Sequence, residues 1–249
     1  MRTAMTVFLQ QRTRIKVCGL TREEDVDTAV AAGVDAVGFV LYAPSPRAVT
    51  PERAAQLARR LPPFVTPVLL FVNESATNVI AACALTAGAT AQFHGDESAA
   101  DCLAATGHGA RPFVRAARIP LGEEGVRFDL VKYAATYSQA QAILLDAHVE
   151  GYGGGGKAFH WSLLPPSVNS HLVLSGGLTP ANVTDGIVQV RARGLSLAVD
   201  VSSGVERDGP DGKPLRGIKD ADKIHRFVAA VRAADAQLAN TPHGLLPAT

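Results

Sequence analysis

The sequence predicts an α/β protein that folds as a single-domain (β/α)8 TIM barrel. Short apolar segments alternate with amphipathic ones along the chain, which is typical of strands and helices in βαβ units. The apolar segments lack regular polar alternation, as expected when both faces of a parallel sheet are covered. The length of 249 residues is close to the roughly 250 residues of a typical eight-unit barrel.

The expected strands are short apolar runs, and the expected helices are the amphipathic stretches between them. The eight strands are Arg14–Cys18, Ala36–Val40, Pro67–Phe71, Thr90–Phe93, Arg111–Arg115, Ala142–Leu145, Leu172–Ser175 and Leu197–Val201. The helices are expected at about 22–32, 51–60, 76–87, 97–105, 127–139, 180–190 and 220–234. An open doubly wound sheet is the alternative, but no G-x-G-x-x-G follows the first strand, so a dinucleotide-binding fold has little support.

Polar residues and glycines mark several helix ends. Thr21-Arg-Glu-Glu24 fits a capping box. Thr50-Pro51 and Thr179-Pro180 each place a capping hydroxyl before a proline at the first helical position. Gly33 and Gly88 follow alanine-rich helical runs and are expected as left-handed C-caps.

The barrel is expected to span residues 13–234, with residues 1–12 and 235–249 as terminal extensions. Two segments within it are expected to be loops. Arg207–Gly217 is polar and rich in glycine and proline, and Gly151–Gly156 is glycine-rich and expected to be mobile.

Composition excludes several functional classes. Hydrophobic residues make up 47% of the chain, enough for a large core, and a net charge of +1 with scattered Lys and Arg argues against a nucleic-acid surface. The three cysteines are odd in number and lack metal-ligand spacing, so neither a disulfide framework nor a metal site is indicated. The apolar run at 6–9 is too short for a signal-peptide core. No segment approaches the roughly 20 apolar residues that span a bilayer. These features predict a cytoplasmic protein, and they do not exclude a small anionic substrate, which needs only local positive potential.

Cys18 ends the first strand and is the candidate base. A lone cysteine is more often a small buried core residue. However, side chains at i and i+2 share one face of a strand, so Lys16 and Cys18 are expected to face the barrel interior together. A nearby ammonium favours the thiolate, whose unperturbed pKa is about 8.5. Cys18 is therefore expected to act as a base near neutral pH.

Asp146 closes the sixth apolar strand and is the candidate acid. Its alternative role is a helix cap or a turn residue. Burial of a carboxylate among leucines is costly and favours its protonated form, which suits a general acid. A thiolate and a carboxylic acid on opposing strands would make a pair that moves a proton across a small sugar.

The loops after the seventh and eighth strands are the candidate phosphate site. Barrel phosphate sites are often built from these loops, and glycines let backbone N–H groups approach an anion. Ser175–Pro180 contains two adjacent glycines, and Asp200–Glu206 contains two serines and a glycine. Asp200 is expected to bind a sugar hydroxyl, or to cap its loop. The expected ligand-binding residues of the two loops are Gly176, Gly177, Asp200, Ser202 and Ser203.

Three further side chains are candidates at the site. Arg47 follows two prolines that stiffen its loop, and arginine binds a carboxylate in a bidentate manner. Its alternative is a solvated surface position. Gln92 and His94 end the fourth strand and are expected to contact or support the substrate; a lone histidine there is more often structural. Cys83 and Cys102 lie in expected helices and are assigned to the core.

These residues together resemble the phosphoribosylanthranilate isomerase family over roughly residues 13–234. The matching segments, in order, are Lys16–Thr21, Ala36–Val40, Ser45–Val49, Pro67–Asn73, Gln92–Asp96, Leu144–Asp146, Gly153–Gly156, Ser175–Leu178 and Asp200–Glu206. The resemblance implies a (β/α)8 barrel that uses no cofactor or metal. It implies an Amadori rearrangement of N-(5-phosphoribosyl)anthranilate in tryptophan biosynthesis. It also implies Cys18 as general base, Asp146 as general acid, Arg47 as partner of the anthranilate carboxylate, and the two loops as phosphate site.

The chain departs from the family pattern at a few positions. His160 stands where the family usually has an aspartate, Gly151–Lys157 is unusually glycine-rich, and Ser175 replaces the commoner alanine. Other phosphate-binding barrels, such as an epimerase, a synthase or another isomerase, are one alternative; paired aspartates or a catalytic lysine would favour them. A non-catalytic phospho-ligand binding protein is another, but neither acid nor base is missing. The assembly is expected to be a monomer or a homodimer.

Overall fold

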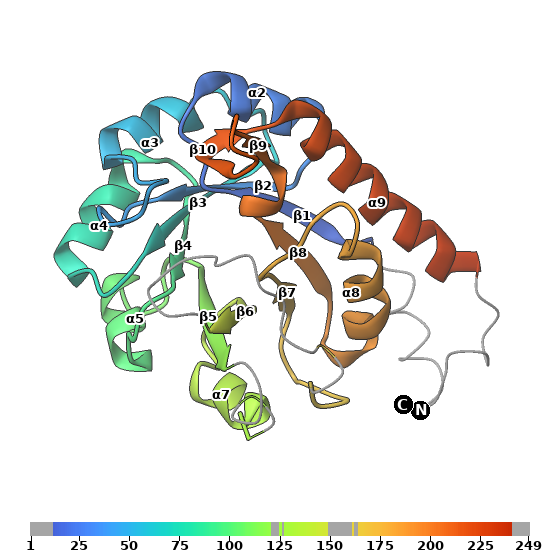
Figure 1. The fold of residues 1–249 in the computed structure, drawn as a ribbon. Helices are drawn as coiled ribbons and strands as arrows, with labels where there is room; N and C mark the ends of the chain where they lie inside the picture. Colours follow the sequence, from blue (N-terminus) through green and yellow to red (C-terminus); the bar gives the residue numbers. More distant parts are fainter. Residues whose placement is uncertain (1–11, 121–124, 126, 149–160, 162–163, 241–249) are drawn as a thin grey trace.

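A computed structural model describes residues 12–120, 125, 127–148, 161 and 164–240. Eight parallel strands pair in sequence order, and the last pairs with the first to close a barrel (Figure 1). The barrel strands are β1 (Arg14–Cys18), β2 (Ala36–Val40), β3 (Thr66–Phe71), β4 (Thr90–Phe93), β5 (Phe113–Pro120), β6 (Ala142–His148), β7 (Leu172–Leu174) and β8 (Leu197–Val201). The predicted (β/α)8 TIM barrel is therefore confirmed.

The helices cover the outside of the barrel (Figure 1). They are α2 (Glu23–Ala31), α3 (Pro51–Ala58), α4 (Ala76–Leu85), α5 (Ala99–Ala105), α7 (Leu130–Thr136), α8 (Val183–Val190) and α9 (Ala221–Asn240). One continuous cluster of buried apolar side chains fills the layer between strands and helices, for example Val17, Phe39 and Ile143. No helix among the described residues is long and apolar enough to cross a membrane.

Two strands run further than their apolar runs predicted. β5 begins after Pro112 and continues to Pro120, because the charged Arg115 that was expected to end it is buried and neutralised inside the fold. β6 continues to His148, so Asp146 is part of the strand and pairs in register with Arg118 of β5. Hydropathy alone does not predict either extension, because a charged residue after an apolar run is usually taken to mark the end of the strand.

Some predicted helix ends are confirmed and others are wrong. Thr50 accepts a hydrogen bond from the Arg53 N–H, as expected of a cap before proline, and Gly33 adopts φ +83° after α2. The capping box at Thr21 is absent: α2 starts at Glu23, and the Thr21 hydroxyl donates to the Gly217 carbonyl instead. The Thr21 side chain therefore bonds to a residue distant in the sequence and does not cap the helix.

Three further ends differ from the sequence prediction. α8 starts at Val183, because Thr179-Pro180 opens a turn before the helix. Gly88 has φ +71° but lies in the turn beyond the C-cap of α4, which is Thr86. The last helix, expected to end at 234, runs to Asn240 and packs mainly on α8 and α2.

The segment Arg207–Gly217 was predicted as a loop, and this prediction is wrong. It forms most of an antiparallel hairpin of β9 (Glu206–Asp208) and β10 (Pro214–Lys219). The hairpin lies over the β1 and β8 side of the barrel near α2 (Figure 1). Gly209, Pro210 and Gly212 belong to the turn that joins the strands, whereas Pro214 and Gly217 lie in β10. The expected glycine-rich loop Gly151–Gly156 and His160 lie outside the described residues.

Candidate active site

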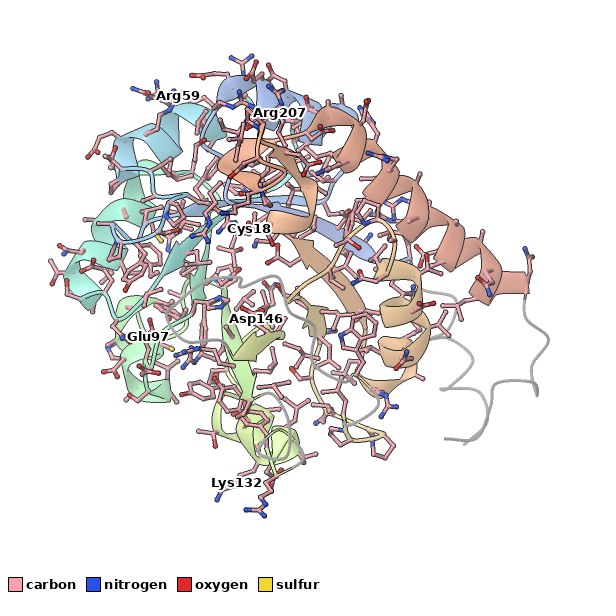
Figure 2. The ribbon with its side chains drawn as sticks, viewed as in Figure 1. Cys18, Arg59, Glu97, Lys132, Asp146 and Arg207 are labelled. Carbon is pink, nitrogen blue, oxygen red and sulfur yellow. The ribbon has the colours of Figure 1, made fainter. Side chains whose placement is uncertain are left out.

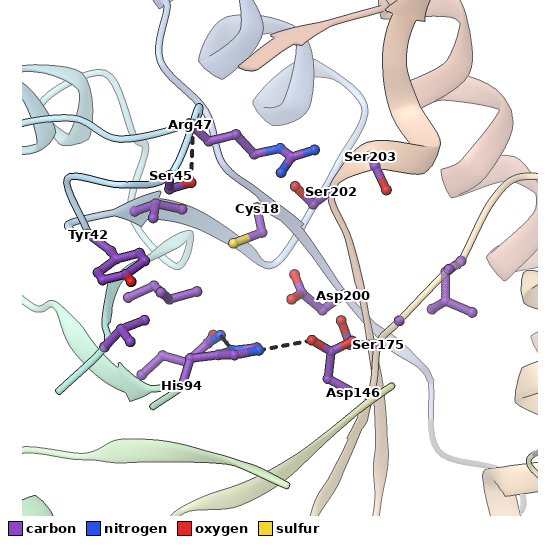
Figure 3. A pocket seen from close by; sticks show the side chains of 17 residues that line it. Cys18, Tyr42, Ser45, Arg47, His94, Asp146, Ser175, Asp200, Ser202 and Ser203 are labelled. Atoms are coloured by element: carbon purple, nitrogen blue, oxygen red, sulfur yellow. Dashed lines mark hydrogen bonds and ion pairs between the residues drawn. The ribbon is translucent and has the colours of Figure 1, made fainter. Parts of the chain in front are cut away.

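A cavity opens at the carboxyl ends of the barrel strands. Figure 3 shows that side chains from several strands and the loops after them line it. In Figure 2, Cys18 and Asp146 lie near the barrel centre, whereas Arg59 and Lys132 lie at its rim. The polar residues that line the cavity are Cys18, Tyr42, Ser45, Arg47, Gln92, His94, Asp146, Ser175, Asp200, Ser202 and Ser203. Several polar groups that converge on one concave surface are typical of a small-molecule site.

The inward face of β1 carries Lys16 and Cys18, as the two-residue period of a strand predicts. Lys16 Nζ donates to Asp200 Oδ1 at 2.9 Å, across the β1–β8 pairing that sets these residues opposite each other. Gly38 of β2 leaves the room they occupy: a Cβ there would lie 2.6 Å from Cys18 Sγ and 3.1 Å from Lys16 Nζ. Cys18 lines the cavity, whereas Lys16 lies behind Asp200 and does not.

The Cys18 thiol is less acidic than the sequence suggested. Burial raises its pKa above the ordinary value, and the nearby Lys16 ammonium lowers it by less than burial raises it. Asp200 explains why, since its carboxylate neutralises Lys16 and itself opposes a negative thiolate. Burial alone would lower the pKa of Lys16, but Asp200 and Cys18 together raise it. The raised pKa favours the neutral thiol near neutral pH in the resting protein, whereas the sequence led us to expect the thiolate.

A chain of hydrogen bonds holds Asp146. His94 Nε2 lies 2.9 Å from Asp146 Oδ2, and Gln92 Nε2 lies 3.2 Å from His94 Nδ1. An amide nitrogen can only donate, so Nδ1 accepts and Nε2 carries the proton that is donated to Asp146. All three side chains are buried and line the cavity (Figure 3). His94 thus acts on Asp146, a role that its position after β4 alone did not show.

A buried ion pair holds the loop that carries His94. Arg115 of β5 donates to the carbonyls of Phe93 and Gly95, which flank His94, at 3.0 Å each. Glu97 lies 3.2 Å from the Arg115 guanidinium and accepts from the Gly95 N–H. Tyr133 and Tyr137 stack near the guanidinium on the helix side. The backbone on both sides of His94 is therefore fixed from outside the cavity.

Arg47 is buried and not solvated. Its guanidinium forms a bidentate pair with Glu206, with Nε–Oε1 at 2.6 Å and Nη2–Oε2 at 2.8 Å. Burial by itself would raise the pKa of Glu206, but Arg47, Lys219 and the Gly217 N–H together hold it below the ordinary value. Among the described residues, Nη1 of Arg47 has no hydrogen-bond partner. This edge of the guanidinium is available to a ligand in the cavity.

The loops after β7 and β8 lie side by side at one edge of the cavity, because the two strands are neighbours in the barrel. Gly176 and Gly177 have φ of +77° and +66°, which only glycine adopts without strain, and both line the cavity. Ser202 and Ser203 of the neighbouring loop also line the cavity (Figure 3). Lys219, on β10, donates from behind to the Ser202 carbonyl at 2.9 Å. The two loops form a cradle with hydroxyl and backbone donors.

The structure gathers every candidate site residue except Lys16 on the wall of one cavity. Sequence reasoning missed Tyr42, Lys219 and the pairing of Glu206 with Arg47. Tyr42 could have been found because it follows β2 at the carboxyl end. Lys219 could not, because its burial depends on the unpredicted hairpin. Within the part of the chain that the structure describes, no group of three or more His, Cys, Asp or Glu is arranged to hold a metal ion.

Comparison with known proteins is consistent with this site. The model of the family described as N-(5'phosphoribosyl)anthranilate (PRA) isomerase matches residues 15–230. The isomerase of Methylibium petroleiphilum is 60% identical over 228 residues, covering 92% of this chain and 98% of the relative. That of Leptothrix cholodnii is 56% identical over 233 residues, covering 94% and 97%.

Solved structures of the same enzyme share the fold. The phosphoribosyl anthranilate isomerase of Thermotoga maritima has a TM-score of 0.74 and 37% identity, covering 89% of this chain and 99% of that one. A second structure, with TM-score 0.70, 34% identity and the same coverage, is a complex with reduced 1-(o-carboxyphenylamino)-1-deoxyribulose 5-phosphate. A third, with TM-score 0.69, 32% identity and the same coverage, is described as monomers generated from the dimeric Thermotoga maritima enzyme.

Proposed function

The chain belongs to the N-(5'-phosphoribosyl)anthranilate isomerase family, and from that premise we propose that Cys18 and Asp146 carry out its reaction. The reaction is an Amadori rearrangement in tryptophan biosynthesis. It converts N-(5'-phosphoribosyl)anthranilate into 1-(2-carboxyphenylamino)-1-deoxyribulose 5-phosphate. The observation that carries the proposal is that one thiol and one carboxyl group, on β1 and β6, line the same cavity.

Asp146 acts as the general acid in the first step. It donates a proton to the ribose ring oxygen, the C1–O bond breaks, and the anilino nitrogen lone pair forms the C=N bond of a protonated Schiff base. His94 holds Oδ2 through its Nε2–H, so Oδ1 is the oxygen free to carry the transferred proton. The hydrogen bond also fixes the direction of the carboxyl group, which proton transfer requires.

Cys18 acts as the general base in the second step. The thiolate removes the proton from C2, and the electron pair neutralises the iminium nitrogen to give an enolamine. The enolamine then tautomerises to the ketone product. Because the thiol is neutral at rest, the protein must first lose the Cys18 proton, and Lys16 beside it stabilises the resulting charge.

The two anionic groups of the substrate fit two parts of the cavity. The cradle of Gly176, Gly177, Ser202 and Ser203 suits the phosphate, since its hydroxyl and backbone N–H groups are donors. The free edge of Arg47 suits the anthranilate carboxylate. Asp200 and Gln92 suit sugar hydroxyls. The Gln92 Oε1 atom is buried and lacks a hydrogen-bond partner in the described structure, so a substrate hydroxyl would satisfy it.

Turnover of phosphoribosylanthranilate by the purified protein tests the proposal. The reaction is followed by the loss of substrate fluorescence, after treatment with EDTA and without added nucleotide or metal. We expect turnover under these conditions. Binding of the reduced product analogue without turnover would contradict the isomerase mechanism while leaving the phosphate cradle in place. Dependence on an added metal or cofactor would contradict the proposed cofactor-free reaction.

The cellular location and the assembly of the protein are two further proposals. Three free cysteines fit a reducing compartment, so we propose the cytoplasm. The dimeric relative from Thermotoga maritima supports a homodimer, with a monomer as the alternative. Light scattering of the purified chain decides between the two.

A further inference from the structure

Lys219 is a buried cation that the proposed mechanism does not use. It lies on β10 of the hairpin, and its side chain has no exposed surface. Its Nζ donates to the Ser202 carbonyl at 2.9 Å, to Ser202 Oγ at 3.4 Å and to Glu206 Oε1 at 3.4 Å. One ammonium therefore joins the phosphate cradle to the carboxylate that holds Arg47.

The charges around Lys219 do not balance. Glu206 is the single carboxylate between Arg47 and Lys219, so these three residues carry a surplus of one positive charge when Lys219 is protonated. Lys16 and Asp200 form a separate neutral pair, and the Cys18 thiol is neutral. A buried surplus charge is unfavourable unless a counter-charge is near. The cradle, which Ser202 lines and to which Lys219 is hydrogen-bonded, is a place for such a counter-charge.

The protonation of Lys219 reflects this imbalance. Burial lowers its pKa to about 8; Glu206 and Cys18 raise the pKa and Arg47 lowers it, but burial is the largest influence. Other groups that face it are the Asp25 carboxylate, which accepts from its backbone N–H, and Arg22, which donates to its carbonyl. In the empty protein the ammonium is thus only partly populated in the slightly alkaline range.

We propose that binding of the phosphorylated ligand is coupled to protonation of Lys219, which positions the cradle when it is charged. The proposal rests on the proposed function, because it takes the cradle to be the phosphate site. The phosphate dianion of the ligand supplies the missing counter-charge. Ligand binding therefore favours protonation of Lys219, and protonation of Lys219 favours ligand binding, by thermodynamic linkage.

The charged form also orients the cradle. An ammonium has three donors and no acceptor, so Ser202 Oγ must accept from Lys219. The hydroxyl proton of Ser202 is then free to donate to the phosphate. Neutral Lys219 has a lone pair that can accept this proton, which turns the hydroxyl away from the ligand. Protonation therefore adds both a charge and a correctly directed donor.

Calorimetric titration with reduced 1-(o-carboxyphenylamino)-1-deoxyribulose 5-phosphate tests the coupling. Titrations at pH 8 in two buffers of different ionisation enthalpy give the number of protons taken up on binding. At this pH the phosphate of the ligand is already a dianion. We expect measurable net uptake of up to about one proton per site, because part of Lys219 is neutral in the free protein and becomes protonated on binding. Above pH 8 the Kd should rise by up to about tenfold per pH unit.

Two variants separate the effect of charge from that of titration. Lys219→Met should bind the analogue more weakly and take up no proton. Lys219→Arg keeps a charge that does not titrate, so it should take up no proton and bind with a Kd that is flat from pH 7 to 9. Circular dichroism checks that each variant is folded. If a variant does not fold, the proton uptake of the parent protein at pH 8 still tests the proposal.

Each outcome of the titration decides the proposal. Binding by the parent without proton uptake at pH 8, or the same uptake in Lys219→Met, would overturn the coupling and leave the phosphate site intact. No binding of the analogue by the parent at all would instead contradict the phosphate site, and the coupling with it.

Discussion

Cys18 carries a neutral thiol in the resting protein because burial outweighs the influence of Lys16. The strand period correctly placed both side chains inside the barrel. It could not show that Asp200, distant in sequence, neutralises the ammonium that was expected to activate the thiol. The protonation of Cys18 therefore depends on a contact between residues that are far apart in the sequence. The hydrogen-bond partner of Asp146 is also a long-range one, because His94 comes from the loop after β4.

The reactivity of the Cys18 thiol should therefore rise with pH. The base form of Cys18 is the thiolate, and burial raises the thiol pKa, so the thiolate fraction is small at pH 7 and grows as pH increases. Lys16 stays charged over this range because its pKa is also raised. The rate at which iodoacetamide alkylates Cys18, followed by mass spectrometry from pH 7 to 9, should show this increase. A rate that is constant or falls over the range would contradict the raised pKa of the thiol.

At the scale of elements, the strands of the barrel were largely predicted, because apolar runs and turns are local signals. β1, β2, β4 and β8 have the predicted bounds. The hairpin β9–β10 and the extension of β5 through Arg115 were not predictable from the sequence. Their stability comes from long-range partners: Lys219 contacts Ser202 and Glu206, and Arg115 contacts Glu97 and two loop carbonyls.

The glycine of β2 should be essential for activity. In Gly38→Ala the added Cβ lies in contact with Cys18 and Lys16 and displaces the thiol. We expect kcat to fall by about 10- to 100-fold. In the control Gly33→Ala nothing surrounds the new Cβ, but φ is +83°, so stability should fall by about 1 kcal/mol with kcat unchanged. Urea unfolding and steady-state kinetics on both variants check this; equal loss of activity in the two would contradict it.

The buried Arg115–Glu97 pair should stabilise the loop after β4. Arg115→Met leaves the Glu97 carboxylate buried without its cation and two carbonyls without a donor. We expect a loss of about 3 to 5 kcal/mol in the free energy of unfolding. The control Arg53→Met removes an exposed pair with Glu23 and should cost less than about 1 kcal/mol. Chemical denaturation would contradict the assignment if both variants lost the same stability.

At the scale of the whole molecule, closure of the barrel joins distant segments of the chain into one site. The first and last barrel strands pair directly, which places Cys18 near the loop after β8. Strand order therefore explains why residues spread from 18 to 203 line a single cavity. The gathering of these residues at one end of the barrel follows from the eight βα units. The hydrogen-bond partners of the acid, the base and Arg47 do not, because they depend on side-chain packing.

The turnover of Cys18→Ala and Asp146→Ala with phosphoribosylanthranilate tests the central claim most directly. Each variant should lose about 10²- to 10⁴-fold in kcat, while circular dichroism and affinity for the reduced product analogue change little. Cys83→Ala removes a buried thiol outside the cavity and serves as the matched control, with kcat close to that of the parent. A kcat near the parent value in Cys18→Ala or in Asp146→Ala would contradict the assignment of that residue as base or acid.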